Sequence, residues 1–159
     1  MTKRAWILIL GFVLGCGSSP IGGGADPAAA FAGTWTFSSG SIVPMCTGVT
    51  IGNIDLTGAT AVLTHVDATH ISLVSTTGIT CDVRFNVTGT TATAAAGQSC
   101  TIDAGGTIGN VTVNIGTWTL ALSGNSIASN MTGTASVVIV SCTPSSTGTL
   151  TRTGGADGG

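Results

Sequence analysis

The 159-residue chain contains no tyrosine and no glutamate, and it has few charged residues of either sign. Charged residues make up 6% of the sequence, and after Lys3 and Arg4 the basic residues are Arg84 and Arg152. Nucleic-acid binding needs clustered Lys and Arg to neutralise phosphates, so nucleic acid is excluded as a partner. The six aspartates lie singly, without the paired ionisable groups of acid–base catalysis. The sequence therefore predicts a protein that is not an enzyme and has no cofactor.

The chain also lacks an apolar run long enough to span a bilayer. The apolar stretch from Ala5 to Leu14 is interrupted by Gly11 and covers about ten residues, whereas a spanning helix needs roughly 20. It follows the basic pair Lys3-Arg4, and a basic start before a short apolar region is typical of a signal peptide. Residues 1–15 are therefore predicted to be removed on export.

The end of this stretch, Val13-Leu14-Gly15-Cys16, resembles the lipobox cut by lipoprotein signal peptidase. The resemblance implies a bacterial lipoprotein whose mature N-terminus is Cys16, held in a membrane by palmitate-type acyl chains. Gly17 after the cysteine, in place of aspartate, further implies the outer membrane of a Gram-negative cell envelope. The alternative is an ordinary secretory signal cut near residues 28–30.

The cysteine count agrees with lipidation, because removing Cys16 from five cysteines leaves an even number. An even set in an exported chain indicates two disulfide bonds, and their pairing stays open among three possibilities. No two of them have the close spacing of a zinc site. The four cysteines expected to form disulfides are Cys46, Cys81, Cys100 and Cys142.

Composition divides the rest of the chain into three parts. Residues 16–30 are rich in glycine, serine and alanine, show no periodicity and are predicted to form a flexible tether. Residues 31–153 are predicted to form one domain, long enough to bury a core. Residues 154–159 are predicted to be a disordered tail.

Alternating apolar and polar residues predict an all-β domain with no substantial helix after the signal peptide. The clearest strand is 79–88, in which Cys81 is expected to point inward. In 110–122 the apolar phase shifts from odd to even positions, which predicts a bulge at Gly116. The apolar run 137–140, within a strand expected over 134–142, suits a strand covered on both faces or a barrel crossing. About eight to ten strands at this spacing favour a small antiparallel barrel or a β-sandwich.

The start of the domain carries the pattern Gly33-Thr34-Trp35, which resembles the first strand of lipocalins, avidins and other calycin barrels. In that superfamily the indole closes one end of the barrel against an arginine of the last strand. The resemblance assigns these roles to Trp35 and Arg152, with the guanidinium over the indole face. It implies a calycin-like barrel whose interior binds a small apolar ligand, while a generic β-sandwich or another kind of β-barrel stays open as the alternative.

The two histidines, His65 and His70, flank a predicted turn. A hairpin loop of two or four residues would place them directly opposite each other, as half of a metal site. Val62 and Val66 are expected on the core face, so the histidines should face solvent. Only Asp67 lies nearby as a further ligand, and an exposed pair is therefore expected rather than a metal site.

Together these patterns predict a lipid-anchored envelope protein that acts as a non-enzymatic binding module for a small apolar ligand. The alternative is a structural lipoprotein with a solidly packed β-domain, whose polar surface contacts an envelope component or a protein partner. The volume of the barrel interior distinguishes the two.

Overall fold

A computed structural model describes residues 26–75, 79–103, 109–137 and 140–154. In these residues the chain is all-β, as predicted, and its one helical segment is the three-residue 3-10 turn η1 (Ala29–Phe31). The strands are β1 (Gly33–Cys46), β2 (Val49–Thr50), β3 (Ile54–Asp55), β4 (Thr60–Asp67), β5 (His70–Ser75), β6 (Ile79–Thr88), β7 (Thr91–Ala94), β8 (Ser99–Asp103), β9 (Asn110–Ser123), β10 (Ser126–Val137) and β11 (Val140–Gly154).

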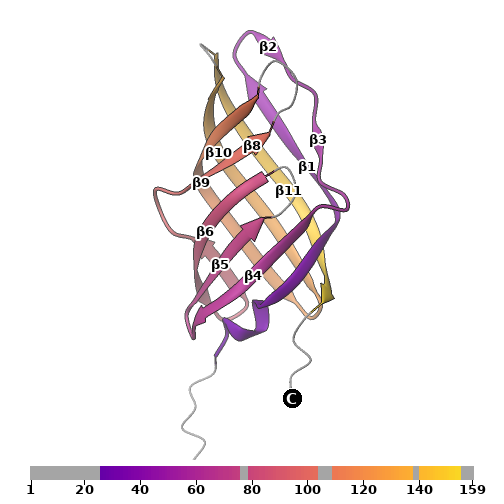
Figure 1. Cartoon of the computed structure of the whole chain (residues 1–159), viewed down its shortest axis with the longest axis vertical. Helices are drawn as coiled ribbons and strands as arrows, with labels where there is room; N and C mark the ends of the chain where they lie inside the picture. Colours follow the sequence, from indigo (N-terminus) through magenta and orange to yellow (C-terminus); the bar gives the residue numbers. More distant parts are fainter. Residues whose placement is uncertain (1–25, 76–78, 104–108, 138–139, 155–159) are drawn as a thin grey trace, which may run out of the picture.

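The strands close into an eight-stranded antiparallel barrel (Figure 1). Neighbouring strands follow the chain as β1, β4, β5 and β6, and then β9, β10 and β11, which pairs again with β1. Between β6 and β9, the short strands β7 and β8 each pair with both neighbours and share one strand position. Because the ring of pairings is complete, the β-sandwich alternative is excluded.

The two ends of the barrel differ. At the end that we call the closed end, Thr34 pairs with Gly154, and η1 lies directly before β1. Both ends of the described chain therefore lie at the closed end (Figure 1). At the other end, which we call the open end, Cys46 pairs with Cys142. Here β2 and β3 pair only with β1, and we call residues 49–55 the strap.

Alternation along the strands separates the interior from the surface. In β6 the side chains of Cys81, Val83 and Phe85 are buried, whereas Arg84 and Asn86 are exposed. This confirms the inward direction expected for Cys81. The buried residues form a larger cluster that includes Trp35, Phe85 and Trp118, and a smaller cluster that includes Ile42 and Ile102.

The bulge predicted at Gly116 is confirmed. In the pairing of β9 with β10, Thr117 lies opposite Thr132 and Ile115 lies opposite Gly133, so Gly116 has no partner. The extra residue lets both Ile115 and Trp118 point into the barrel. On the neighbouring strand β10, the position next to the bulge requires glycine, because a Cβ on Gly133 would lie 2.6 Å from the Asn114 carbonyl oxygen.

Two other strand predictions were wrong. The apolar run 137–140 is not a single strand, since β10 ends at Val137 and β11 begins at Val140. Residues 138 and 139 lie outside the described residues. In β4 the core face is formed by Ala61 and Leu63, whereas Val66 is 54% exposed. Both sets of alternate positions in β4 contain apolar residues, so periodicity alone did not identify the inner face.

The folded unit begins earlier than the sequence indicates. Ala28, which we assigned to the tether, is fully buried in the larger core cluster. The Asp26 carboxylate accepts a hydrogen bond from the backbone N–H of Ala29, the first residue of η1, at 3.0 Å. Residues 26–30 therefore belong to the barrel.

Candidate binding site

A buried tryptophan and an arginine hold η1 in place at the closed end. The Trp35 indole N–H donates to the Phe31 carbonyl oxygen at 2.8 Å. The Arg152 guanidinium carbon lies 4.3 Å from the centroid of the Trp35 ring. Its two terminal nitrogens, Nη1 and Nη2, donate to the carbonyl oxygens of Ala32 and Ala30, each at 2.6 Å. These contacts match the roles that the calycin resemblance implies for Trp35 and Arg152.

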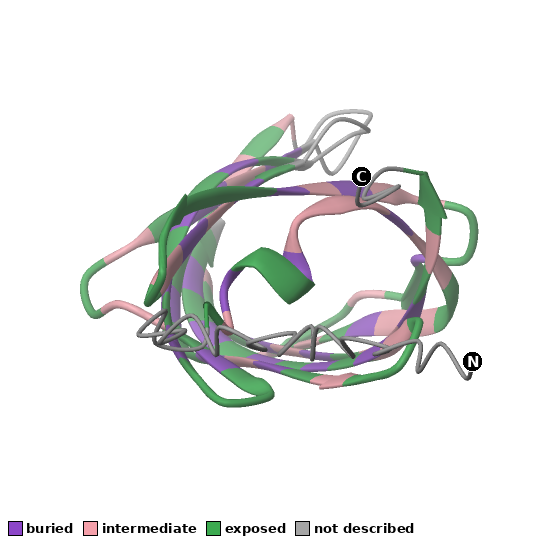
Figure 2. Ribbon diagram, turned by 90° about the horizontal axis from the view of Figure 1, so that it is seen from below, coloured by how far each residue is buried: buried purple, intermediate pink, exposed green. Residues whose placement is uncertain are grey.

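The backbone conformation at Gly33 explains why the Gly-Thr-Trp pattern begins with glycine. Gly33 begins β1 with a φ of 134°, a conformation that favours glycine, and lies opposite Leu63 of β4. From there the chain enters β1 directly after η1. Figure 2 looks along the barrel from the closed end and shows η1 within the ring of strands. This end of the barrel is therefore plugged by its own chain.

Above the plug the interior is filled by aromatic side chains. The rings of Phe85 and Trp118 meet edge to face with centroids 5.5 Å apart. The Trp118 indole N–H donates to the buried hydroxyl of Ser129 at 2.9 Å. Among the described residues, no buried side-chain nitrogen or oxygen lacks a hydrogen-bond partner. This half of the barrel is a packed core.

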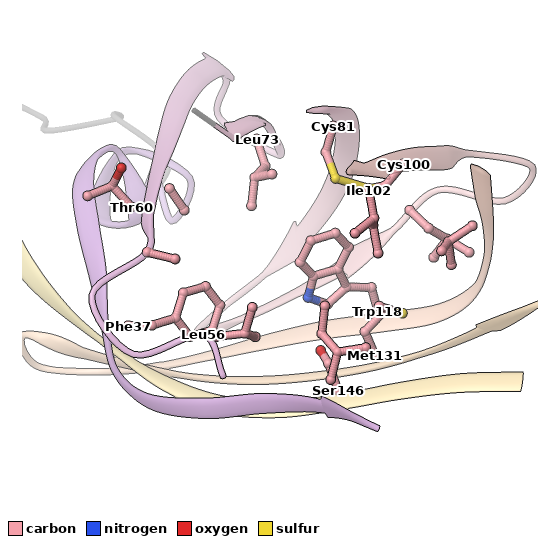
Figure 3. A pocket seen from close by; sticks show the side chains of 15 residues that line it. Phe37, Leu56, Thr60, Leu73, Cys81, Cys100, Ile102, Trp118, Met131 and Ser146 are labelled. Atoms are coloured by element: carbon pink, nitrogen blue, oxygen red, sulfur yellow. A yellow bond between two sulfur atoms is a disulfide. The ribbon is translucent and has the colours of Figure 1, made fainter. Parts of the chain in front are cut away.

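A small cavity, the inner cavity, lies farther along the barrel. Figure 3 shows the side chains of Leu73, Trp118 and the Cys81–Cys100 disulfide pointing toward it. Its volume is about 50 Å³. For comparison, an apolar cavity of about 150 Å³ binds benzene or xenon. The inner cavity is therefore too small to hold an organic ligand by itself.

A larger pocket, the mouth pocket, lies at the open end and has a volume of about 260 Å³. The strap contributes Ile51, Gly52 and Ile54 to it, and the opposite wall comes from β8 and β9. Strands β1, β10 and β11 complete the pocket. Their lining residues are Ile42, Pro44, Ala135 and Pro144, together with the Cys46–Cys142 disulfide. The mouth pocket is thus built from six segments spread between residues 42 and 144.

Three side chains line both spaces and separate them. These are Ile42, Ile102 and Val113, all of which are buried. Because these side chains belong to both linings, we expect that shortening one of them would join the inner cavity to the mouth pocket. We call these three residues the partition.

The open end is apolar on its outside as well. Val43, Met45, Val49 and Ile54 are all large hydrophobic residues with exposed side chains, and Met45 is 59% exposed. They belong to β1 and the strap, next to the mouth pocket. Such a concentration of exposed apolar surface around an opening is typical of a binding site.

The four cysteines form two disulfides, as predicted, and the pairing that the sequence left open is Cys46–Cys142 and Cys81–Cys100. Each bond joins residues directly opposite each other on neighbouring antiparallel strands. Disulfides persist in oxidising compartments and indicate an extracytoplasmic protein. Cys16 lies outside the described residues. In the described part of the chain, no helix has the length and apolar character needed to cross a membrane.

Contrary to the expectation, His65 and His70 do not lie directly opposite each other. A shift in pairing at Val66 places His65 opposite Ile71, and His70 opposite Asp67. His65 contacts the carboxylate of Asp26 at 3.0 Å, and His70 contacts that of Asp67 at 2.8 Å. Within the described ranges, no three His, Cys, Asp or Glu side chains are grouped as metal ligands would be.

The turn between β4 and β5 predicts a specific acid titration. The backbone N–H of Thr69 donates to Asp67 at 2.8 Å, and this bond, together with that from His70, lowers the pKa of Asp67 to about 2. Because the folded state lowers this pKa, the ionised Asp67 stabilises the fold fully at pH values above 3.8, the ordinary pKa of the group. This stabilisation is lost as the pH falls through about 2. NMR titration of the carboxyl carbon should show a midpoint near 2 that rises in His70→Ala. A midpoint of 3.8 in the unaltered protein would contradict this assignment.

The sequence predicted the contact of Trp35 with Arg152 and the four disulfide-bonded cysteines, but not the plug formed by η1 or the mouth pocket. Pro44 and Pro144 lie directly opposite each other, two residues from the disulfide partners Cys46 and Cys142. The mirrored patterns Pro-x-Cys and Cys-x-Pro are visible in the sequence and are the signal that could have paired these two strands. Comparisons of the chain with protein-family models, with curated proteins and with solved structures found no match.

Proposed function

We propose that this chain is a non-enzymatic, calycin-like binding module of the bacterial cell envelope that holds a small apolar ligand in its mouth pocket. The observation that supports this most directly is the change in the barrel interior along its length. The closed end is plugged and packed around Trp35, whereas the open end has an apolar pocket of about 260 Å³. Ligand pockets commonly measure roughly 300–1,000 Å³, so a ligand of modest size fits this site best.

The rival proposal is a structural or surface-interaction lipoprotein with no small-molecule ligand. The small inner cavity and the packed core around Phe85 and Trp118 favour it. The mouth pocket favours the binding module, because its apolar lining stays accessible next to further exposed apolar side chains. A measurement of binding at the mouth pocket therefore separates the two proposals.

Filling the mouth pocket should abolish binding without unfolding the barrel. Ala135 lines the pocket and is buried, so Ala135→Leu places three additional carbon atoms in it. We expect the neutral fluorescent probe N-phenyl-1-naphthylamine to bind the unaltered mature protein and to bind this variant at least tenfold more weakly. Ala128→Leu, on the exposed face of the same strand, is the matched control and should bind normally. Thermal unfolding of both variants verifies that they are folded.

Two results would contradict the binding module. One is the absence of saturable probe binding to the unaltered protein, and the other is equal binding by the Ala135→Leu and Ala128→Leu variants. Native mass spectrometry of the protein purified from its own source adds an independent measurement. A co-purified small molecule supports the module, and an empty monomer supports the structural proposal.

We further propose that the module is a lipoprotein anchored through Cys16 in the outer membrane. The lipobox-like residues 13–16 support this, as do the two disulfides of an extracytoplasmic domain. Labelled palmitate should be incorporated into the unaltered protein and not into Cys16→Ser. Equal labelling of both proteins would rule the anchor out.

A further inference from the structure

The mouth pocket has no polar side chain in its lining. Its lining residues are of the types Ile, Val, Ala, Pro, Gly and disulfide-bonded Cys, none of which has a side-chain nitrogen or oxygen. Pro44 and Pro144, which pair across β1 and β11, also have no backbone N–H to donate. A ligand in this pocket therefore finds neither a charge nor a side-chain hydrogen-bond partner.

No cation of the described residues is near this pocket. Arg152 is at the closed end, where Ala30, Ala32 and Trp35 hold its guanidinium. Arg84 is exposed on the outer face of β6. Residues 76–78, 104–108 and 138–139, which lie outside the described structure, contain no charged residue in the sequence. Asp55 lies in β3, directly after the lining residue Ile54, and its side chain does not line the pocket.

The partition limits the depth of the pocket. Ile42, Ile102 and Val113 separate the mouth pocket of about 260 Å³ from the inner cavity of about 50 Å³. A cavity of about 150 Å³ holds benzene, so the mouth pocket has room for a somewhat larger ring with short alkyl substituents. A longer alkyl chain would have to displace the partition or extend out of the opening into water.

From these observations, and given the proposed function, we propose that the mouth pocket selects a compact, uncharged, hydrocarbon-like molecule and discriminates against acids and amines of the same shape. An ionised group cannot enter the pocket without a partner, because its desolvation is not compensated there. A charged analogue must keep its ionised group in water and can enter only in part. It then buries less apolar surface and loses the corresponding binding energy.

A matched set of probes tests this selectivity on the full mature protein at pH 7. The probes are 4-isopropyltoluene, 4-isopropylbenzoate and 4-isopropylbenzylamine, which share a ring and an isopropyl group and differ in charge. Competition against N-phenyl-1-naphthylamine measures each affinity. We expect the neutral probe to bind at least tenfold more tightly than either ion.

The outcomes distinguish a failure of ligand binding from a failure of the selectivity for uncharged ligands. If no probe competes and N-phenyl-1-naphthylamine does not bind, the proposed binding function itself fails. If the dye binds but the benzoate or the amine competes as well as the neutral probe does, the function stands and the selectivity for uncharged ligands is overturned.

A separate variant tests whether the partition limits the length of the ligand. Ile102→Ala removes part of the partition and should raise the affinity for 4-hexyltoluene at least fivefold relative to 4-isopropyltoluene. Ile127→Ala is the matched control, because Ile127 is buried in the larger cluster and lines neither cavity. An unchanged preference in Ile102→Ala would show that the partition does not limit ligand length.

Discussion

Replacing Cys46 and Cys142 together by alanine is expected to lower the free energy of unfolding by about 4–5 kcal/mol, the largest effect of any change considered. The disulfide joins residues that are 96 positions apart, so its loss frees almost the whole barrel sequence in the unfolded state. A cross-link that closes a loop of about 100 residues contributes about 4.7 kcal/mol in the chain-entropy description. Denaturant unfolding of the oxidised mature protein and of the double variant measures the difference.

The second disulfide is the matched control for this prediction. Cys81 and Cys100 are only 19 positions apart, and a loop of that size corresponds to about 3 kcal/mol. The Cys81→Ala/Cys100→Ala protein should therefore be more stable than the Cys46→Ala/Cys142→Ala protein. The reverse order would show that loop closure does not determine the stabilisation.

Replacing Arg152 by methionine is expected to lower the free energy of unfolding by about 3 kcal/mol. The change removes two charge-assisted hydrogen bonds to the carbonyl oxygens of Ala30 and Ala32, and such bonds are worth about 1.5–3 kcal/mol each. It also removes the contact with the Trp35 ring, worth about 0.5–2 kcal/mol. The methionine side chain recovers part of the apolar packing. Thermal and denaturant unfolding measure the loss.

The other arginine of the described residues provides the comparison. Arg84 lies exposed on the outer face of β6, and Arg84→Met should change stability by less than about 0.5 kcal/mol. A double-mutant cycle with Trp35→Phe adds a sharper test, because the two residues contact each other and their effects should not add. Additive losses would mean that the guanidinium stabilises η1 without the indole.

Local patterns in the sequence predicted much of the fold. Alternation in β6 gave the inward direction of Cys81, and the change of phase in β9 gave the bulge at Gly116, because both depend only on neighbours along one strand. In β4, alternation predicted that Val62 and Val66 face the core, whereas Ala61 and Leu63 do. Both sets of positions contain apolar residues, so the pattern did not distinguish the two faces. Alternation identifies a face only where one of the two sets of positions is polar.

The candidate site was less predictable than the fold. The contact between Trp35 and Arg152 was predicted through the resemblance carried by Gly33 and Trp35, whereas the plug η1 was not predicted. The mouth pocket combines side chains from six segments, and its shape depends on how the strap folds over β1, which no local pattern specifies. The mirrored motifs Pro-x-Cys and Cys-x-Pro are visible in the sequence. They do not by themselves show that Pro44 pairs with Pro144, because this requires knowing which strands are neighbours.

The position of the two chain ends determines how this barrel can be attached to anything else. Asp26 and Gly154 both lie at the closed end, so an anchor, a fused domain or a purification tag on either end is joined to the base of the barrel (Figure 1). Nine residues lie between Cys16 and Asp26, and these ten residue-to-residue steps can span at most about 35 Å. If the protein is anchored through Cys16 as proposed, the tether joins the closed end, and the mouth pocket lies at the end of the barrel farther from the point of attachment. The same arrangement allows the protein to be immobilised through either terminus on a sensor surface with its pocket accessible.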